Sequence, residues 1–308
     1  MTGLKKMCVV VFLCIVSLVY SGDYDELFIE NLKNYPLNDG KLTIEYKAGD
    51  YKGYKSFVAS YKSDNLKLYT LLNIPDTGKK TYPVVIVNHG YIPPQEYSTI
   101  KSYRLISTYF AQNGFIVLKP DYRGHDKSEI LVNDEMQRLY YPVDVLNVLN
   151  TVRSVKNADV NNIFLFGHSM GGGVTLTVLE VMKTIRAASL WAAVSIEYPE
   201  SSLYFMRKRN SESATQIREK LDLMFSEIDY KKLSFTDYFS EISAPVIIHH
   251  GTLDDSCPYQ WSVDLHDRLI KNNVKSVFHS YVDDHNFAKK YFYTVLKRDV
   301  DFFKAAIK

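Results

Sequence analysis

A chain of 308 residues with 46% hydrophobic residues can build one large domain or two small ones around a sizeable core. Its ordinary composition and the lack of an internal period exclude a disordered, collagen-like or solenoid protein. The formal charge of +2 provides no basic field for nucleic acid, so we expect no nucleic-acid partner.

The first residues have the pattern of an export signal. Lys5 and Lys6 precede the apolar stretch 7–20, and small or branched residues lead up to Ser21, where a signal peptidase would cleave. We therefore expect 1–21 to be a signal peptide and the protein to be exported, either secreted or held in the periplasm or cell envelope. The stretch is short for a bilayer span, which needs about 20 residues. Two alternatives remain. The segment is an uncleaved anchor, which would be the one expected contact of the protein with a membrane, or it is a buried N-terminal helix.

Removal of residues 1–21 would change the charge and the cysteine count. Lys and Arg would fall from 37 to 35 and equal the 35 Asp and Glu, so the formal charge would be about zero. Cys8 and Cys14 would leave with the signal, and Cys257 alone would remain. We expect no internal disulfide, so the stability must come from the core.

We expect the remaining residues, 22–308, to form one domain in which strands and helices alternate. After a polar lead-in, 41–75 is rich in β-branched and aromatic residues and predicts antiparallel strands. Short continuous apolar runs, typical of strands buried on both faces, follow at 82–90, 114–121, 162–169, 188–195, 244–251 and 274–281. Helix-length stretches lie among them at 97–112, 133–156, 170–184, 259–272 and 286–306. This alternation predicts an α/β fold, a mostly parallel sheet with helices on both faces.

One segment breaks the alternation. Residues 196–242 separate two predicted strands by far more than a normal connection, and they carry apolar residues at helical spacing. We interpret them as a small helical cap inserted above the sheet and not as a separate domain. The basic run 207–209 within the cap is more typical of a solvated face than of a binding patch.

The sequence FGHSMGGG at 166–173 places Ser169 between glycines, after an apolar run and before a helix-length stretch. G-x-S-x-G alone is a weak signal, but strand, sharp turn and helix is the setting of a nucleophile elbow. In such an elbow Gly167 and Gly171 leave room where side chains would collide. The alternative is an ordinary hydroxyl in a loop of small residues, and the partners of the serine decide between the two.

A serine hydroxyl needs a base to accept its proton, and the elbow fold supplies its partners in the order serine, acid, histidine. Asp254 and Asp255 follow the predicted strand 244–251, and His285 follows the predicted strand 274–281. Because the carboxyl ends of parallel strands meet at one edge of a sheet, these side chains are expected close to the serine.

A tetrahedral oxyanion would need backbone donors. The N–H groups of Met170, next to the serine, and of Tyr91, in the loop after the strand 82–90, are the candidates. We interpret His89, His249 and His250 as structural residues. The sequence has no glycine-rich phosphate loop and no metal-ligand spacing, so we expect neither a cofactor nor a metal.

Five stretches, VVIVNHGY, KPDYRGHDKS, IFLFGHSMGGG, IIHHGTLDDSCP and YVDDHNF, make residues 65–308 resemble the α/β-hydrolase superfamily. The resemblance is strongest to the catalytic domain of the prolyl oligopeptidase family and to related esterases. It implies that Ser169 is the nucleophile, His285 the base and Asp254 the acid, since the first aspartate of the HGTxD motif serves there.

The resemblance also implies packing and ion-pair roles for Asp121 and Arg123, but the chain departs from the family at three points. Asp126 replaces a usual glycine, and Cys257 replaces a usual branched apolar residue. The roughly 60 residues before the core are too few for the N-terminal propeller of the oligopeptidases.

An exported serine hydrolase acting on carboxylic esters is therefore our first expectation. A peptidase acting on short peptides with the same triad is the second, and a non-catalytic binding protein on a hydrolase fold is the third. The expected partner is a small-molecule or a short acylated or peptidic substrate.

Overall fold

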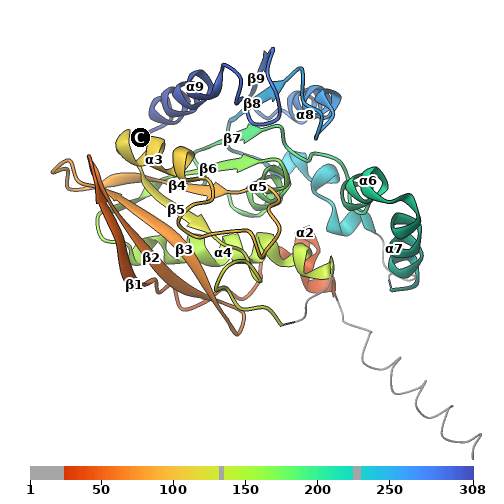
Figure 1. Cartoon of the computed structure of the whole chain (residues 1–308), viewed down its shortest axis with the longest axis horizontal. Coiled ribbons are helices and arrows are strands. Elements are labelled where there is room, and N and C mark those ends of the chain that lie inside the picture. The colour runs from red at the N-terminus through yellow and green to blue at the C-terminus, as the bar shows by residue number, and fades with distance from the viewer. Residues whose placement is uncertain (1–23, 132–134, 225–229) are drawn as a thin grey trace, which may run out of the picture.

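The computed structural model describes residues 24–131, 135–224 and 230–308, so the predicted signal peptide 1–21 lies outside the described residues. The described chain contains a nine-stranded sheet in the order β1-β2-β3-β5-β4-β6-β7-β8-β9 (Figure 1). The strands are β1 (Thr43–Tyr51), β2 (Tyr54–Ser63), β3 (Leu66–Pro75), β4 (Tyr82–Asn88), β5 (Ile116–Pro120), β6 (Ala158–His168), β7 (Ala187–Trp191), β8 (Val246–Gly251) and β9 (Ser276–Tyr281).

The sheet has an antiparallel and a parallel part. β1, β2 and β3 pair antiparallel in sequence order, and β3 pairs antiparallel with β5. From β5 to β9 every pairing is parallel, so the predicted mostly parallel sheet is confirmed. The apolar runs of β5, β7 and β8 are buried at every position, as expected for strands covered on both faces. β9 is only partly buried, contrary to the prediction for 274–281, because it lies at the edge of the sheet.

Helices cover both faces of the sheet. The helices of the described residues are α2 (Ile29–Leu32), α3 (Arg104–Gln112), α4 (Tyr141–Thr151), α5 (Met170–Val181), α6 (Glu200–Arg209), α7 (Ser211–Met224), α8 (Tyr259–Lys271) and α9 (Phe292–Ala305). Side chains of α3 and α9 pack with Val85 and Val87 of β4, whereas those of α4, α5 and α8 share a cluster with Val84 and Ile86. Because alternate residues of a strand face opposite sides, these clusters lie on the two faces.

The helix predicted at 97–112 is shorter than expected, because α3 begins only at Arg104. Tyr103, just before it, has a φ of 55°, a left-handed conformation that interrupts a helix. Earlier in the segment, the hydroxyl of Tyr97 donates to the buried carboxylate of Asp121 at 3.0 Å. These tertiary contacts replace the first turns of the helix.

The helices predicted at 133–156 and 286–306 also differ from expectation. The first consists of the 3-10 turn η2 (Glu135–Tyr140), then α4 with Pro142 in its first turn, then a short 3-10 turn. Proline is well tolerated in a first helical turn, so α4 starts there. The second begins at Phe292, because the Asp283 carboxylate accepts the backbone N–H groups of residues before it.

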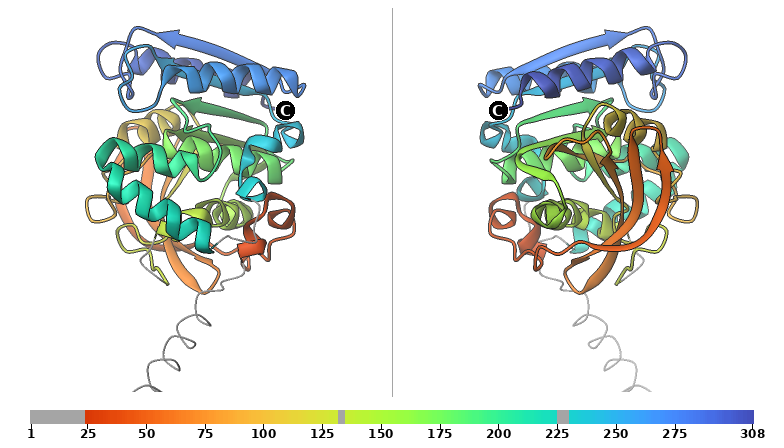
Figure 2. Two further views of the ribbon diagram at one scale, coloured as in Figure 1. Left: turned by 90° about the vertical axis from the view of Figure 1, so that its right-hand side faces the viewer. Right: turned by 90° about the vertical axis from the view of Figure 1, so that its left-hand side faces the viewer.

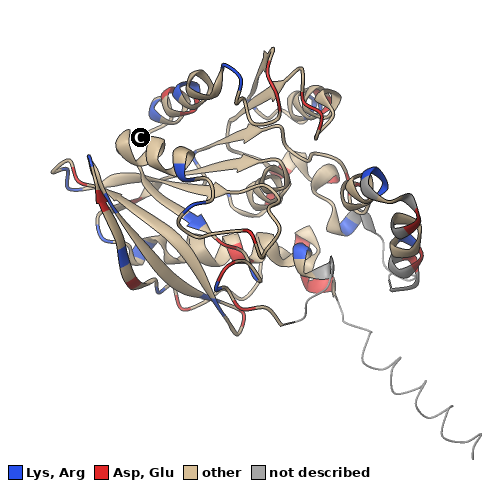
Figure 3. Cartoon of the chain, in the orientation of Figure 1, with Lys and Arg blue, Asp and Glu red and all other residues tan. Residues whose placement is uncertain are grey.

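The inserted segment 196–242 holds α6 and α7, followed by the 3-10 turns η4 (Tyr230–Leu233), η5 (Phe235–Asp237) and η6 (Phe239–Glu241). Figure 2 shows α6 and α7 in front of the sheet in its left view. Within the described residues, no helix is long and apolar enough to cross a membrane. Figure 3 shows basic and acidic residues intermingled on the same elements.

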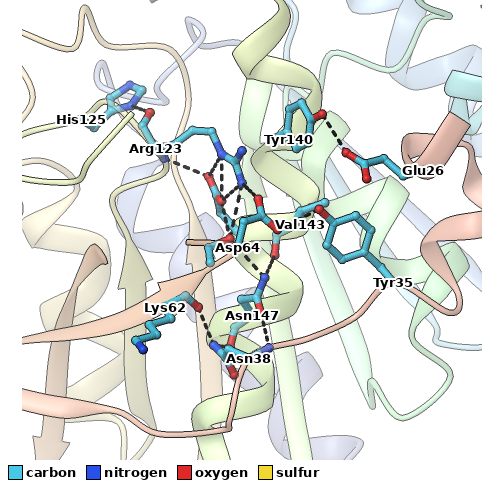
Figure 4. A network of polar contacts seen from close by, with 12 residues as sticks. Glu26, Tyr35, Asn38, Lys62, Asp64, Arg123, His125, Tyr140, Val143 and Asn147 are labelled. Carbon is cyan, nitrogen blue, oxygen red and sulfur yellow. Dashed lines mark hydrogen bonds and ion pairs between the residues drawn. The ribbon is translucent and has the colours of Figure 1, made fainter. Parts of the chain in front are cut away.

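A buried ion pair ties the antiparallel strands to the helical layer (Figure 4). The Arg123 guanidinium lies 2.7 Å from the carboxylate of Asp144 on α4 and 2.9 Å from that of Asp64. The Arg123 and Asp144 side chains are 1% and 0% exposed. On the same helix, the Asn147 side chain accepts the backbone N–H of Asn38 at 2.8 Å. The turn after β5, the β2–β3 hairpin and the N-terminal segment therefore meet at α4.

We predict that Asp144→Ala lowers the free energy of unfolding by about 3–5 kcal/mol, because it leaves the Arg123 guanidinium buried without its main counterion. Urea denaturation followed by circular dichroism measures this loss. Asp301→Ala is the matched control, since its partner Lys297 is exposed and surface pairs contribute little. Equal losses in the two variants would show that the buried pair does not hold these elements together.

Candidate active site

Ser169 lies on a strained turn between β6 and α5. Its φ of 55° and ψ of −121° are costly for a residue with a side chain. Three backbone hydrogen bonds hold the turn: Ser169 N–H donates to the Trp191 carbonyl at 2.9 Å, and its carbonyl accepts from Gly172 at 2.9 Å and Val194 at 3.0 Å. The strand predicted at 188–195 ends at Trp191, and Val194 beyond it bonds to this turn. The geometry is that of a nucleophile elbow.

Glycines beside the turn allow two segments to touch. A Cβ at Gly171 would overlap the carbonyl oxygens at the end of β4. A Cβ at Gly90, in the loop after β4, would lie 3.1 Å from the Ser169 Cβ. This close approach places Tyr91 and Met170, whose backbones are the two expected oxyanion donors, at the same pocket as the serine.

The structure brings together His285 and Asp254, from the loops after β9 and β8. His285 Nδ1 lies 2.7 Å from Asp254 Oδ2. The Asp254 carboxylate is buried and also lies 3.0 Å from His250 Nε2. The Asp255 side chain instead contacts the hydroxyl of Ser256, so the geometry selects the first aspartate as the partner of the histidine.

Two imidazoles and the local backbone set the charge of Asp254. Burial alone would raise the pKa of this carboxyl, but hydrogen bonds from His250 and His285 outweigh burial and hold the pKa well below its ordinary value. The backbone N–H groups of Ser256 and Cys257 donate to the same carboxylate at 2.8 and 2.9 Å. The carboxylate therefore stays ionised throughout the pH range in which imidazoles ordinarily titrate.

Hydrogen bonds to a buried carboxylate of its own hold the loop that carries His285 in place. The Asp283 carboxylate is buried and accepts backbone N–H groups from Asp284 and from the turn at 289–291, at 2.8 to 3.0 Å. A Cβ at Gly251, the end of β8, would overlap carbonyl oxygens of the same loop. The loop is therefore packed directly on the strand that leads to the acid.

A second polar chain links the loop after β4 to the histidine loop. The Gly90 N–H donates to the Tyr103 hydroxyl at 2.7 Å, and that hydroxyl is hydrogen-bonded to His168 Nδ1. His168 Nε2 lies 3.1 Å from the His285 carbonyl oxygen, and the two rings are 4.7 Å apart. Burial, reinforced by the nearby His285, lowers the pKa of His168 to about 3. A neutral His168 then donates from Nε2 and accepts from Tyr103 at Nδ1.

Ser169 and His285 line one pocket, but no hydrogen bond joins these two described side chains. The Ser169 hydroxyl instead lies 4.0 Å from the sulfur of the buried Cys257, and burial raises the pKa of that thiol to about 12. Catalytic hydrogen bonds are often loose in the absence of substrate. Because Asp254 occupies Nδ1 of His285, Nε2 is the nitrogen that can accept the serine proton once the hydroxyl turns toward it.

The pocket beside Ser169 has a volume of about 420 Å³ and is lined by the loop after β4, by α5, by the inserted segment and by the N-terminal segment. Its described lining is mostly apolar and aromatic, and Arg138 and Lys208 are the basic Lys and Arg side chains in it. Arg138 lies over the Tyr91 ring, 5.1 Å from its centroid, and Lys208 donates to a backbone carbonyl of the acid loop. None of the described lining residues is an aspartate or glutamate.

Three residues that support the site carry no functional prediction from the sequence. The sequence predicts a structural role for His250, whereas this residue contacts the Asp254 carboxylate directly. His168 and Tyr103 carry no prediction at all. The position of His168 beside the serine is a signal that could have found it, but Tyr103 lies 65 residues away from His168 in the chain.

Two other histidines near the strand ends are placed as structural residues would be. His89 is buried between the rings of Tyr97 and Tyr122, with centroid distances of 4.4 and 4.3 Å. His249 is buried and hydrogen-bonded to the Tyr281 hydroxyl. In the part of the chain that the structure describes, no three His, Cys, Asp or Glu side chains are grouped to hold a metal.

Comparison with known proteins identifies the family. The family model for the prolyl oligopeptidase family matches residues 101–308, more than half of the chain. No curated protein matches the chain in sequence.

Solved structures share the fold at low sequence identity. Acetyl xylan esterase 1 from Thermoanaerobacterium sp. JW/SL YS485 has a TM-score of 0.64 and 14% identity, covering 91% of this chain and 93% of its own. Est1E from Butyrivibrio proteoclasticus with ferulic acid bound has a TM-score of 0.61 and 18% identity. This match covers 80% of this chain and 98% of the Est1E chain. The acylaminoacyl peptidase of Pyrococcus horikoshii has a TM-score of 0.66 and 20% identity, covering 84% of this chain but 44% of its own.

We predict that Tyr103→Phe slows the labelling of Ser169 by a fluorophosphonate about 10-fold, because one hydrogen bond to Gly90 and one to His168 are lost. The labelling rate of the purified protein measures the effect. Tyr109→Phe, on the helix that follows and outside this polar chain, should label at the wild-type rate. Identical rates for all three proteins would show that the Tyr103 hydroxyl does not position the reactive groups.

Proposed function

Since this chain belongs to the prolyl oligopeptidase family of serine hydrolases, we propose that it hydrolyses carboxylic esters, with Ser169 as the nucleophile. The solved structures that share its fold include esterases and peptidases, so the site itself must favour one activity. The ester proposal rests on one observation above all: the described pocket beside Ser169 is mostly apolar, and the Lys, Arg, Asp and Glu side chains in its lining are two cations, Arg138 and Lys208.

The proposed reaction follows the site geometry. Ser169 attacks the ester carbonyl while His285 accepts its proton at Nε2, and Asp254 holds the Nδ1–H of the resulting imidazolium. The backbone N–H groups of Met170 and Tyr91 stabilise the oxyanion. His285 returns the proton to the departing alcohol, leaving an acyl-serine. Water, activated by the same imidazole, then releases the carboxylic acid and the free serine.

A peptidase acting on short peptides is the second candidate, supported by the family match and by the fold of the acylaminoacyl peptidase. Recognition of a free, positively charged amino terminus on a short peptide calls for a carboxylate near the serine. The described lining of the pocket offers Arg138 and Lys208 instead, which would repel an ammonium group. Two neighbours that match over nearly their whole length are an acetyl xylan esterase and a ferulic acid complex, which also supports ester substrates.

The function is tested by comparing p-nitrophenyl esters with aminoacyl-p-nitroanilides on the purified protein. We expect kcat/KM for the best ester to exceed that for any anilide by at least about 100-fold, because the described pocket offers no anchor for an ammonium group. Faster turnover of the anilides would overturn the ester proposal in favour of the peptidase. A protein that hydrolyses neither and never reacts with a fluorophosphonate would be a binding protein on this fold.

Matched variants assign the activity to the proposed residues. Ser169→Ala should lower kcat by about 10⁶-fold, and Asp254→Asn by about 10⁴-fold, whereas Asp255→Asn should retain most activity. Steady-state kinetics on the best ester measures all three. The two aspartates differ in what they contact, so the pair of asparagine variants separates loss of the acid from a general change of loop charge. A severe loss in Asp255→Asn with a mild one in Asp254→Asn would reverse the choice of acid.

We also propose that the protein is exported, on the strength of the signal pattern in residues 1–21. Expression with a C-terminal tag in a host with a secretory pathway should yield a soluble exported protein whose amino terminus is Gly22. Edman sequencing measures this end. An intact Met1 on membrane-bound protein would support the uncleaved anchor instead.

A further inference from the structure

The pocket beside Ser169 runs along one face of α5. Met170, Gly173, Val174 and Thr177 all line it, and their spacing of three, four and seven residues places them on one side of the helix. From the first to the last of these residues the helix rises by about 10 Å. The pocket therefore extends well beyond the space that an acetyl group needs at the serine.

Aliphatic side chains surround the part of the pocket toward the carboxyl end of α5, away from Ser169, because their cluster packs against Val181. Leu27 and Leu32 come from the N-terminal segment, Leu139 from η2 and Leu233 from η4. Leu27 and Leu32 are each 3% exposed and belong to a buried cluster that Leu139 and Leu233 contact. This end of the pocket is therefore suited to a group that has no polar atoms.

Two hydroxyls that line this part of the pocket, those of Thr177 and Ser234, already have local partners. The Thr177 hydroxyl donates to the Gly173 carbonyl of its own helix at 3.4 Å. The Ser234 hydroxyl lies 3.2 Å from that of Thr236. Because these hydroxyls are engaged, they do not call for a polar group on the ligand.

The direction of the pocket decides which part of an ester it holds. In the proposed reaction His285 protonates the departing alcohol, so the alcohol must lie on the His285 side of Ser169. Leu27 and Leu32 pack with Val181 at the carboxyl end of α5, whereas His285 lies against His168, the residue before Ser169 at the other end of this helix. The group that extends along α5 toward Leu32 is therefore the acyl group.

We infer that the substrates are esters of medium-length saturated fatty acids, whose acyl chain extends along α5 and ends against Leu27 and Leu32. This inference rests on the proposed ester hydrolysis at Ser169. An extended chain covers roughly 1.2 Å per bond, so about 10 Å of helix corresponds to about eight carbon atoms. Each buried methylene should raise kcat/KM about fourfold until the pocket is full.

The experiment measures kcat/KM for p-nitrophenyl esters from acetyl to dodecanoyl, together with feruloyl and cinnamoyl esters. The wild-type protein should prefer chains of about six to eight carbons over acetyl by at least about 30-fold. Acetyl as the best substrate, or a feruloyl ester better than every alkyl ester, would overturn the inference while leaving ester hydrolysis intact. Hydrolysis of anilides without any ester turnover would instead overturn the proposed function.

Two variants at the end of the pocket test the assignment of its length. Leu32→Trp should lower kcat/KM for the octanoyl ester at least about 10-fold more than for the butanoyl ester, and Leu27→Ala should move the optimum to longer chains. Ile270→Trp, at an exposed position on α8, is the matched control and should leave the chain-length profile unchanged. An equal loss for all esters in Leu32→Trp, with no shift in Leu27→Ala, would show that these leucines do not limit the acyl chain.

Discussion

The site depends on the direct contact between the β6–α5 turn and the end of β4. Gly171 has no room for a side chain, because carbonyl oxygens of Asn88 and His89 lie against it. This contact brings the start of α5 beside the loop that carries Tyr91, so the two expected oxyanion donors come from segments that touch. The positive φ of Ser169 costs about 1–3 kcal/mol, and the bonds from this turn to the residues at the end of β7 hold it in place. A larger residue at Gly171 would therefore disturb Ser169 and the two expected oxyanion donors together.

His285 and Asp254, the proposed base and acid, follow β9 and β8 in the chain and depend on a separate set of contacts. Their side chains are hydrogen-bonded to each other, and the Asp283 carboxylate accepts backbone N–H groups of the loop that carries His285. His168 then connects that loop to Tyr103 and to the loop after β4. His285 and the loop that carries Tyr91 are thus connected by a continuous set of part-buried hydrogen bonds. Since buried polar groups are costly when unpaired, loss of one member affects the others.

The parallel sheet and the place of Ser169 could be predicted from the sequence because both leave local patterns: continuous apolar runs, and a glycine-flanked serine between a strand and a helix. The pairing of Asp254 with His285 followed from chain order at strand ends. The late start of α3 could not be predicted from the sequence. The left-handed backbone of Tyr103 goes together with hydrogen bonds to Gly90 and His168, which lie elsewhere in the chain. The contact between His250, the second histidine of β8, and Asp254 could not be predicted from the sequence for a similar reason. The apolar run around it predicts a buried strand and says nothing about which groups meet there.

The reacting groups and the pocket walls come from different parts of the chain. Serine, acid and histidine all follow strands of the parallel sheet, so their positions depend on strand order and change little when connections lengthen. The far end of the pocket is built from the N-terminal segment, η2 and η4, none of which belongs to the sheet. Leu32 and Leu233 are far apart in the sequence, yet both enclose the space beside α5. If the proposed acyl group occupies this space, substitutions in these segments would change the length of acyl chain that is accepted without moving the turn that holds Ser169.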